Sequence, residues 1–107
     1  MKLALIIRIR STSGSSWQRA LSYIESATRQ GHEVIHCFFQ AEGVRVAEDA
    51  TRIATWSTAC ERLSIQMTLC SQAVERYHIQ VPAPCVIGGL GGVIEAAVNA
   101  DRVVSFV

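Results

Sequence analysis

Two apolar runs rich in β-branched residues flank one amphipathic segment, and this order constrains the fold more than any other feature of the sequence. Residues 2–9 and Glu33–Phe39 have the near-continuous apolar character of strands buried in a parallel sheet. Between them Gly31 stands where a left-handed helix C-cap belongs, after apolar side chains at helical spacing: Trp17, Ala20, Leu21, Ile24 and Ala27. A strand, a helix and a second strand in this order predict a βαβ unit.

Beyond residue 40 the apolar spacing continues to alternate between helix and strand. It predicts, in order, a helix marked by Ile53, Trp56, Cys60 and Leu63, a strand over 65–69, a short helix over 71–77, an irregular proline segment over 81–85, a helix around 93–98 and a strand over 103–107. We therefore expect one domain over residues 1–107. Its fold class is α/β, a three-layer sandwich around a mostly parallel sheet of about five strands, related in topology to flavodoxins.

Composition excludes several classes of protein. Half of the residues are apolar and 18% are charged, so disorder is excluded and the excess apolar surface predicts an oligomer. Ten basic and nine acidic residues form no basic stripe, which argues against direct nucleic-acid binding. The longest apolar run, Leu3–Ile7, is far shorter than the roughly 20 residues of a membrane span. Arg8 and Arg10 interrupt it before it reaches signal-peptide length, so we expect a cytoplasmic protein without membrane contact.

Cys70 is the strongest candidate for chemistry among the four cysteines. In open α/β sheets, sites form beyond the carboxyl ends of the strands, and Cys70 ends one strand and begins the next helix. The partial positive charge of a helix N-terminus favours a thiolate, which is the nucleophilic form of cysteine. The alternative is that Cys70 is a small buried apolar residue, as cysteines often are.

The other cysteines and the histidines have weaker patterns. Cys37 and Cys60 lie on predicted inward faces and are expected in the core. Cys85 lies in the proline-bracketed segment, where it could be exposed, so it is a candidate secondary thiol. The sequence contains no C-x-x-C pair, and the three histidines, His32, His36 and His78, do not have the spacing of metal ligands. We therefore expect no metal site and no cofactor. In a cytoplasmic protein the four cysteines are expected to be reduced thiols.

Two small-residue loops allow other interpretations. The segment Ser11–Ser16 follows the first strand and is similar to the phosphate cradle of flavodoxins, which would make the chain a small flavin or nucleotide binder. Serine and glycine are also ordinary constituents of a turn between a strand and a helix. The segment Gly88–Gly92 lacks the spacing of a dinucleotide fingerprint and the lysine of a P-loop, and such glycines more often serve a tight turn.

Several short motifs, taken in order, resemble the DsrE/TusD family of sulfur-relay proteins over nearly the whole chain. They are Phe38-Phe39 followed by Glu42-Gly43-Val44, a cysteine at the end of the third predicted strand, and Gly89-Leu90-Gly91 leading through Glu95-Ala96 to the run from Asp101 to Phe106. The resemblance implies a DsrE/F-like fold and a sulfurtransferase that carries sulfur as a persulfide on Cys70. Ser71 would support the thiolate, and four residues would shape the neighbouring loops: Glu42, Gly43, Gly89 and Gly91.

The resemblance also implies partners. Members assemble with homologous subunits, DsrF- and DsrH-like or TusB- and TusC-like, into heterohexamers, and a homo-oligomer is the alternative. A TusA-like donor and a TusE-like acceptor would place the chain in tRNA 2-thiouridine synthesis. A DsrC-like acceptor would place it in the oxidation of stored sulfur. Compared with the family pattern, the chain is short between Val44 and Trp56 and again between Cys70 and Gly88, and the second gap would leave Cys70 less covered.

One further alternative assigns the chain no chemistry. An assembly subunit of a DsrE/F-like oligomer would use its apolar surface only for subunit contacts, with Cys70 buried and inert. Exposure and reactivity of the Cys70 thiol distinguish this alternative from a sulfur carrier.

Overall fold

A computed structural model describes residues 1–107, and it forms five strands, four α-helices and one 3₁₀ segment. In chain order these are β1 (Lys2–Ile7), α1 (Gly14–Arg29), β2 (Glu33–Phe39), η1 (Ala41–Glu48), α2 (Ala50–Leu63), β3 (Gln66–Cys70), α3 (Ser71–Tyr77), β4 (Val86–Gly88), α4 (Leu90–Asn99) and β5 (Arg102–Phe106). Ser13 caps α1, and Gly31 adopts a φ of 89° just after it, as predicted.

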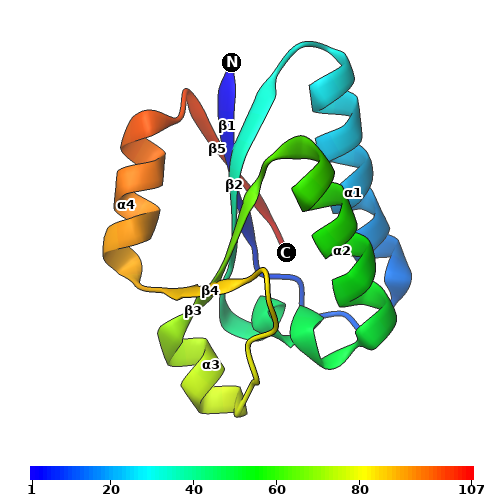
Figure 1. Cartoon of the computed structure of the whole chain (residues 1–107), viewed down its shortest axis with the longest axis vertical. Helices are drawn as coiled ribbons and strands as arrows, with labels where there is room; N and C mark the ends of the chain where they lie inside the picture. Colours follow the sequence, from blue (N-terminus) through cyan, green and yellow to red (C-terminus); the bar gives the residue numbers. More distant parts are fainter.

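The five strands form one parallel sheet in the order β4-β3-β2-β1-β5. Helices α1 and α2 cover one face of the sheet and α4 lies alone on the other (Figure 1). The predicted three-layer α/β sandwich is therefore confirmed. All strands run in the same direction, so their carboxyl ends meet at one edge of the molecule, where α3 and η1 also lie.

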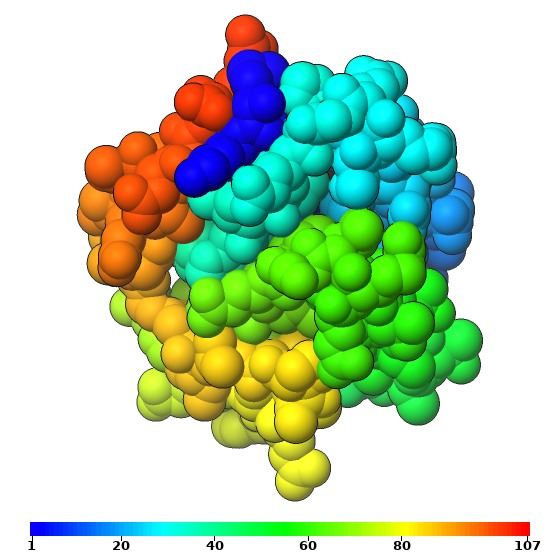
Figure 2. Space-filling view, turned by 45° about the horizontal axis from the view of Figure 1, so that its top comes forward, coloured from blue at the N-terminus to red at the C-terminus, as the bar shows by residue number.

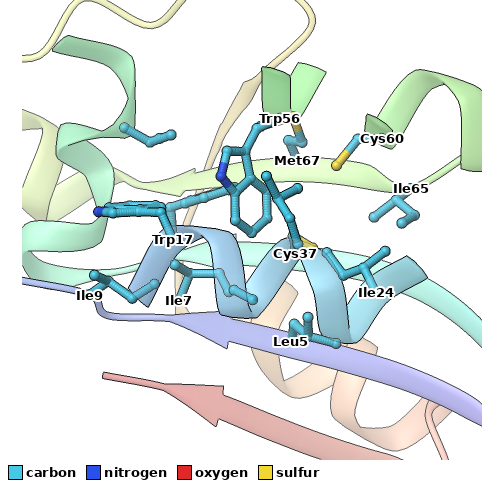
Figure 3. Packing of buried hydrophobic residues seen from close by; sticks show 14 of the residues in the cluster. Leu5, Ile7, Ile9, Trp17, Ile24, Cys37, Trp56, Cys60, Ile65 and Met67 are labelled. Carbon is cyan, nitrogen blue, oxygen red and sulfur yellow. The ribbon is translucent and has the colours of Figure 1, made fainter. Parts of the chain in front are cut away.

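The apolar core fills the space between the sheet and the α1–α2 layer. Trp56 of α2 is fully buried there, and its ring meets the rings of Trp17 and Phe39 edge-on, with centroids 6.0 and 5.3 Å apart. Figure 3 shows these tryptophans among the aliphatic side chains of β1 and α1, with Cys37 and Cys60 nearby. Edge-to-face aromatic pairs add about 0.5–1.5 kcal/mol each beyond their burial, so this cluster holds α1 and α2 on the sheet.

The opposite face of the sheet is more polar. Because side chains alternate along a strand, burial of Met67 and Leu69 in the core directs Gln66 and Thr68 of β3 toward α4. The neighbouring strand presents His36 on the same face, since it pairs with Gln66. The two faces of the sheet therefore differ in chemistry, and the α4 face adjoins Cys70.

Two elements differ from the sequence prediction. Strand β4 occupies residues between the predicted proline segment and the last predicted helix, where no strand was expected, and η1 occupies residues before the helix of Ile53 to which no element was assigned. Strand β4 has three residues at the sheet edge, with Val86 and Ile87 both exposed, so no alternation of burial marks it in the sequence. No helix combines the length and apolar character that crossing a membrane would require.

Gly43 permits the close contact between η1 and the end of β1. Its backbone N–H donates to the carbonyl of Gln40 (2.8 Å), and Gln40 N–H donates to the carbonyl of Ile7 (2.9 Å). A β-carbon added at Gly43 would overlap the Ile7 carbonyl oxygen and lie 2.9 Å from the carbonyl carbon. Both are backbone atoms, so a side chain there would force the two segments apart.

We expect Gly43→Ala to lower the free energy of unfolding by about 2–3 kcal/mol, the upper part of the usual range for forced overpacking, because the overlap is with backbone atoms. Gly14→Ala is the matched control, because a β-carbon at Gly14 meets nothing within 4 Å, and it should change the same quantity by less than about 1 kcal/mol. Urea denaturation followed by tryptophan fluorescence measures both. Equal stability of the Gly43→Ala variant and the wild type would contradict this packing.

Candidate functional site

Cys70 lies at the carboxyl end of β3, where it is the last strand residue and the N-cap of α3. Of the four cysteines it alone is partly exposed; the other three are buried. Because the strands are parallel and Cys70 ends β3, it lies at the same end of the sheet as the loops after β1, β2 and β4. Cys70 is therefore not buried as the assembly-subunit alternative expects, whereas the reactivity of its thiol stays a prediction.

A cavity of about 430 Å³ lies beside Cys70, between the strand ends and the start of α4. Besides Cys70, it is lined by residues that follow four different elements, including Arg8, Gln40, Ser71, Gly89 and Leu90. A second hollow of about 320 Å³ meets Cys70 from the side of α3, where Arg76 and Tyr77 line it. Cys70 is thus accessible from two directions, and a small substrate or a partner's peptide would reach it through either hollow.

The charged residues around Cys70 are all cationic. Arg8 lines the larger cavity and Arg76 the smaller, and no carboxylate lines either of them. A positive potential stabilises a thiolate or any other anion that forms on sulfur. Both guanidinium groups belong to exposed residues, so salt will screen their effect.

Segment η1 is held against α3 next to the smaller hollow. The Arg45 guanidinium carbon lies 4.5 Å from the centroid of the Tyr77 ring, which is a cation–π contact. Tyr77 itself lines the hollow with Cys70. This contact fixes one wall of the site to the loop that follows β2.

A further hollow of about 370 Å³ lies beneath α4 and adjoins the Cys70 cavity, with which it shares Phe38, Thr68 and Gly88. In it, His36 Nε2 and Thr68 Oγ1 are 2.6 Å apart and hydrogen-bonded, and the imidazole stacks on Phe38 with centroids 3.9 Å apart. Burial lowers the pKa of His36, so near pH 7 the imidazole is neutral. The hydrogen bond and the stacking hold the imidazole in place without a ligand.

The three remaining cysteines belong to the interior. Interaction with the side chain of Cys60, together with burial, raises the pKa of the Cys37 thiol. Burial raises the pKa of Cys85 to about 11, with a smaller contribution from Cys60. The expectation that Cys85 is exposed is wrong, because its loop turns inward through the hydrogen bond from Cys85 N–H to the carbonyl of Pro82.

Residues of Ser11–Ser16 line neither hollow at Cys70. Their polar groups are used within the loop: Ser13 Oγ and Ser15 Oγ lie 3.0 Å apart, and Ser13 N–H donates to Ser11 Oγ. The Trp17 indole N–H donates to the Ser11 carbonyl. The loop therefore serves to cap α1, which supports the interpretation as an ordinary turn.

The structure brings together only some of the predicted supporting residues. Ser71 and Gly89 line the cavity with Cys70, whereas Glu42, Gly43 and Gly91 do not. Gly43 instead has the structural role described above. Arg8 was missed by sequence reasoning, since only the pairing of β1 with β2 places the end of β1 beside the loop after β2. No cluster of three histidine, cysteine or acidic side chains has the arrangement of a metal site.

Comparison with known proteins identifies relatives over the whole chain. The model of the DsrE/DsrF-like family matches residues 1–106. The protein of Allochromatium vinosum named "Putative sulfurtransferase DsrE" is 28% identical over an alignment of 131 positions that covers 99% of this chain and 98% of that protein. The sulfurtransferase TusD homolog of Pseudomonas aeruginosa is 31% identical over 111 positions, covering 83% of this chain and 85% of that protein.

Solved structures share the fold at low sequence identity. The YchN protein of E. coli superposes with a TM-score of 0.73 at 17% identity, covering 99% of this chain and 100% of that one. A protein of Bacteroides thetaiotaomicron, BT1422, gives a TM-score of 0.72 at 14% identity, with 98% and 94% of the two chains covered. The alignment with the A. vinosum protein has more positions than this chain has residues, so this chain lacks segments which that relative has.

We expect Arg8→Gln to slow alkylation of Cys70 by the anion iodoacetate about two- to threefold at low salt, while alkylation by neutral iodoacetamide changes less. The reason is that Arg8 supplies positive charge in the cavity beside the thiol. Arg10→Gln is the matched control, because Arg10 is exposed and lines neither hollow. Peptide mapping by mass spectrometry gives the rates at Cys70. An unchanged ratio of the two rates, or the same change in the control, would show that Arg8 does not act on the thiol.

Proposed function

The chain belongs to the DsrE/DsrF-like family, and from this membership we propose that it is a sulfur carrier whose Cys70 thiol accepts a sulfane sulfur and passes it on. The observation that carries the proposal is the position of Cys70. It is the one cysteine that is partly exposed, and it lies at the strand ends, where it lines two hollows. The relatives named as sulfurtransferases support the same activity.

The reaction needs no oxidant and no cofactor. The Cys70 thiolate attacks the outer sulfur of a donor persulfide, R–S–SH, so that the new S–S bond forms as the donor S–S bond breaks, and the donor leaves as the thiolate R–S⁻. The product is Cys70–S–SH. An acceptor thiolate then attacks the outer sulfur of this persulfide, takes it, and releases the Cys70 thiolate. Each step exchanges one S–S bond for another.

The surroundings of Cys70 suit both steps. Each begins and ends with a thiolate, and Arg8 and Arg76 supply positive charge without a nearby carboxylate in the lining of either hollow. Ser71 and Gln72 add polar groups to the same lining. Cys85 is buried and its pKa is raised, so the proposed transfer does not include it. A role of Cys85 in relaying sulfur stays an untested prediction.

The donor and acceptor are themselves proposals. A TusA-like donor and a TusE- or DsrC-like acceptor would each present a cysteine on a small protein surface, and the two hollows give separate approaches to Cys70. The named relatives include both a DsrE and a TusD homolog. We therefore propose the carrier step for this chain and keep tRNA thiolation and sulfur oxidation as its two alternative pathways.

Intact-protein mass spectrometry after incubation with a small-molecule persulfide tests the carrier step. We expect a gain of about 32 Da, the mass of one sulfur, that dithiothreitol removes. The gain should disappear in Cys70→Ser, whose substitution is nearly isosteric, and persist in Cys85→Ser. Circular dichroism checks that both variants fold.

A sulfur adduct that survives in folded Cys70→Ser would contradict the proposed role of Cys70. The absence of any adduct on the wild-type chain would favour the assembly subunit instead, because that alternative needs no reactive thiol.

A further inference from the structure

The Thr68 hydroxyl is a buried polar group that takes no part in the transfer described above. Thr68 is 5% exposed, and it is the only residue with a side-chain hydroxyl among the buried residues of the chain. Burying a hydroxyl is unfavourable unless the group is hydrogen-bonded, and here it bonds to His36 Nε2 beneath α4. Thr68 also lines the cavity beside Cys70, which brings the hydrogen-bonded pair next to the proposed chemistry.

The bond to His36 leaves the Thr68 hydroxyl able to donate. A hydroxyl has one hydrogen to donate and two lone pairs with which to accept. When His36 Nε2 carries the ring hydrogen, the imidazole donates to Thr68 Oγ1 at 2.6 Å, and the hydroxyl hydrogen is free for another acceptor. The imidazole is held by stacking on Phe38, with centroids 3.9 Å apart. The pair therefore presents a buried donor whose oxygen is fixed in position.

Thr68 and Cys70 lie on the same face of β3, two residues apart. At a rise of about 3.3 Å per residue, their positions are about 6.6 Å apart along the strand, and no hydrogen bond joins Thr68 to the resting thiol. A persulfide places a second sulfur about 2 Å beyond Cys70 Sγ. Turned back along the strand, this outer sulfur lies over Thr68 and within reach of its hydroxyl.

Gly88 leaves the space above Thr68 open. It pairs with Cys70 in the register of β3 and β4, and it lines the same two hollows as Thr68. Figure 2 shows the chain of this edge strand at the surface, between the yellow proline segment and α4 in orange. A β-carbon on Gly88 would overlap Thr68 Cγ2, so the methyl group points toward β4 and the hydroxyl toward β2, where His36 lies. A larger residue at Gly88 would fill the room that the outer sulfur needs.

We propose that the Thr68 hydroxyl, positioned by His36, donates a hydrogen bond to the outer sulfur of the Cys70 persulfide and so stabilises the loaded chain. The proposal rests on the carrier function proposed above. The outer sulfur becomes an anion, Cys70–S–S⁻, when the persulfide releases its proton to solvent, and hydrogen bonds to an anion are stronger than those to a neutral acceptor. Loading still exchanges one S–S bond for another, and no proton leaves Thr68 or His36. His36 is a positioning residue, because it acts on the sulfur only through Thr68.

The Thr68 hydroxyl differs from the arginines of the site in two ways. Arg8 and Arg76 are exposed, so salt screens their charge, whereas the Thr68 hydroxyl is buried and is oriented before the sulfur arrives. The arginines also act on the resting thiolate, whereas Thr68 reaches only the added sulfur. Thr68 should therefore stabilise the stored sulfur without changing the reactivity of the free thiol.

A loading equilibrium tests the proposal on the full chain. The chain is equilibrated with glutathione persulfide and glutathione at a fixed ratio, and intact-protein mass spectrometry gives the ratio of loaded to free chain. Thr68→Val keeps the shape of the side chain without its hydroxyl and should lower this ratio about five- to tenfold, the usual contribution of one hydrogen bond. Thr68→Ser keeps the hydroxyl and should stay within about twofold of the wild type. His36→Phe keeps an aromatic ring on Phe38 without the donor and should lower the ratio about two- to threefold.

Two controls separate a hydrogen bond to sulfur from a loss of structure. Alkylation of the free Cys70 thiol by neutral iodoacetamide should proceed at the wild-type rate in Thr68→Val, because Thr68 does not reach that thiol. Thr58→Val is the matched control for the substitution itself, since Thr58 is exposed on α2 and lines neither hollow, and it should load like the wild type.

Equal loading of Thr68→Val and the wild type would overturn the proposal and leave the carrier function intact. Loading of Thr68→Ser as weak as that of Thr68→Val would overturn it as well, because the hydroxyl would not be the cause. Alkylation that slows in step with the lost loading would show that Thr68 has only a structural role. A wild type that takes up no sulfur would contradict the carrier function itself, and the proposal with it.

Discussion

Burial of Met67 and Leu69 against the α1–α2 layer fixes the direction of every other side chain on β3. Because the side chains of a strand alternate, Thr68 and Cys70 lie on the face of the sheet opposite to these two residues. Cys70 is also the last residue of the strand, so it lies at the end of the sheet. Trp56 closes the core above them through its contacts with Trp17 and Phe39. A shift of β3 by one residue would bury the thiol of Cys70, so the site depends on the same packing that stabilises the fold.

The two faces of the sheet carry different kinds of side chain. The α1–α2 face holds the apolar core, which includes the buried thiols of Cys37 and Cys60. The α4 face is thinly covered; it carries His36 and Thr68 beneath α4 and the reactive end of β3 beside it. The candidate chemistry at Cys70 therefore belongs to this second face, and Leu90 at the start of α4 lines its cavity.

Much of the fold follows from apolar spacing, because each long element buries one side. Strand β2, helix α3 and the capped ends of α1 lie where the sequence predicts them. Strand β4 could not be predicted in this way, since this edge strand has three residues and buries none of them, so its sequence shows no pattern of burial. Cys85 was misjudged because prolines usually indicate an exposed loop, whereas here the turn at Pro82 directs the thiol inward. Arg8 lies in the site because β1 pairs with β2, and the local sequence around Arg8 does not predict that pairing.

Transfer through Cys70 is the central claim, and an isotope experiment in two steps tests it most directly. The chain is loaded with ³⁴S from a labelled persulfide, freed of excess donor, and mixed with an acceptor that carries a single cysteine thiol. The account predicts that the heavy sulfur leaves the Cys70 peptide and appears on the acceptor cysteine in equal amount. Heavy sulfur that stays on Cys70, or that reaches the acceptor equally well from Cys70→Ser, would contradict it.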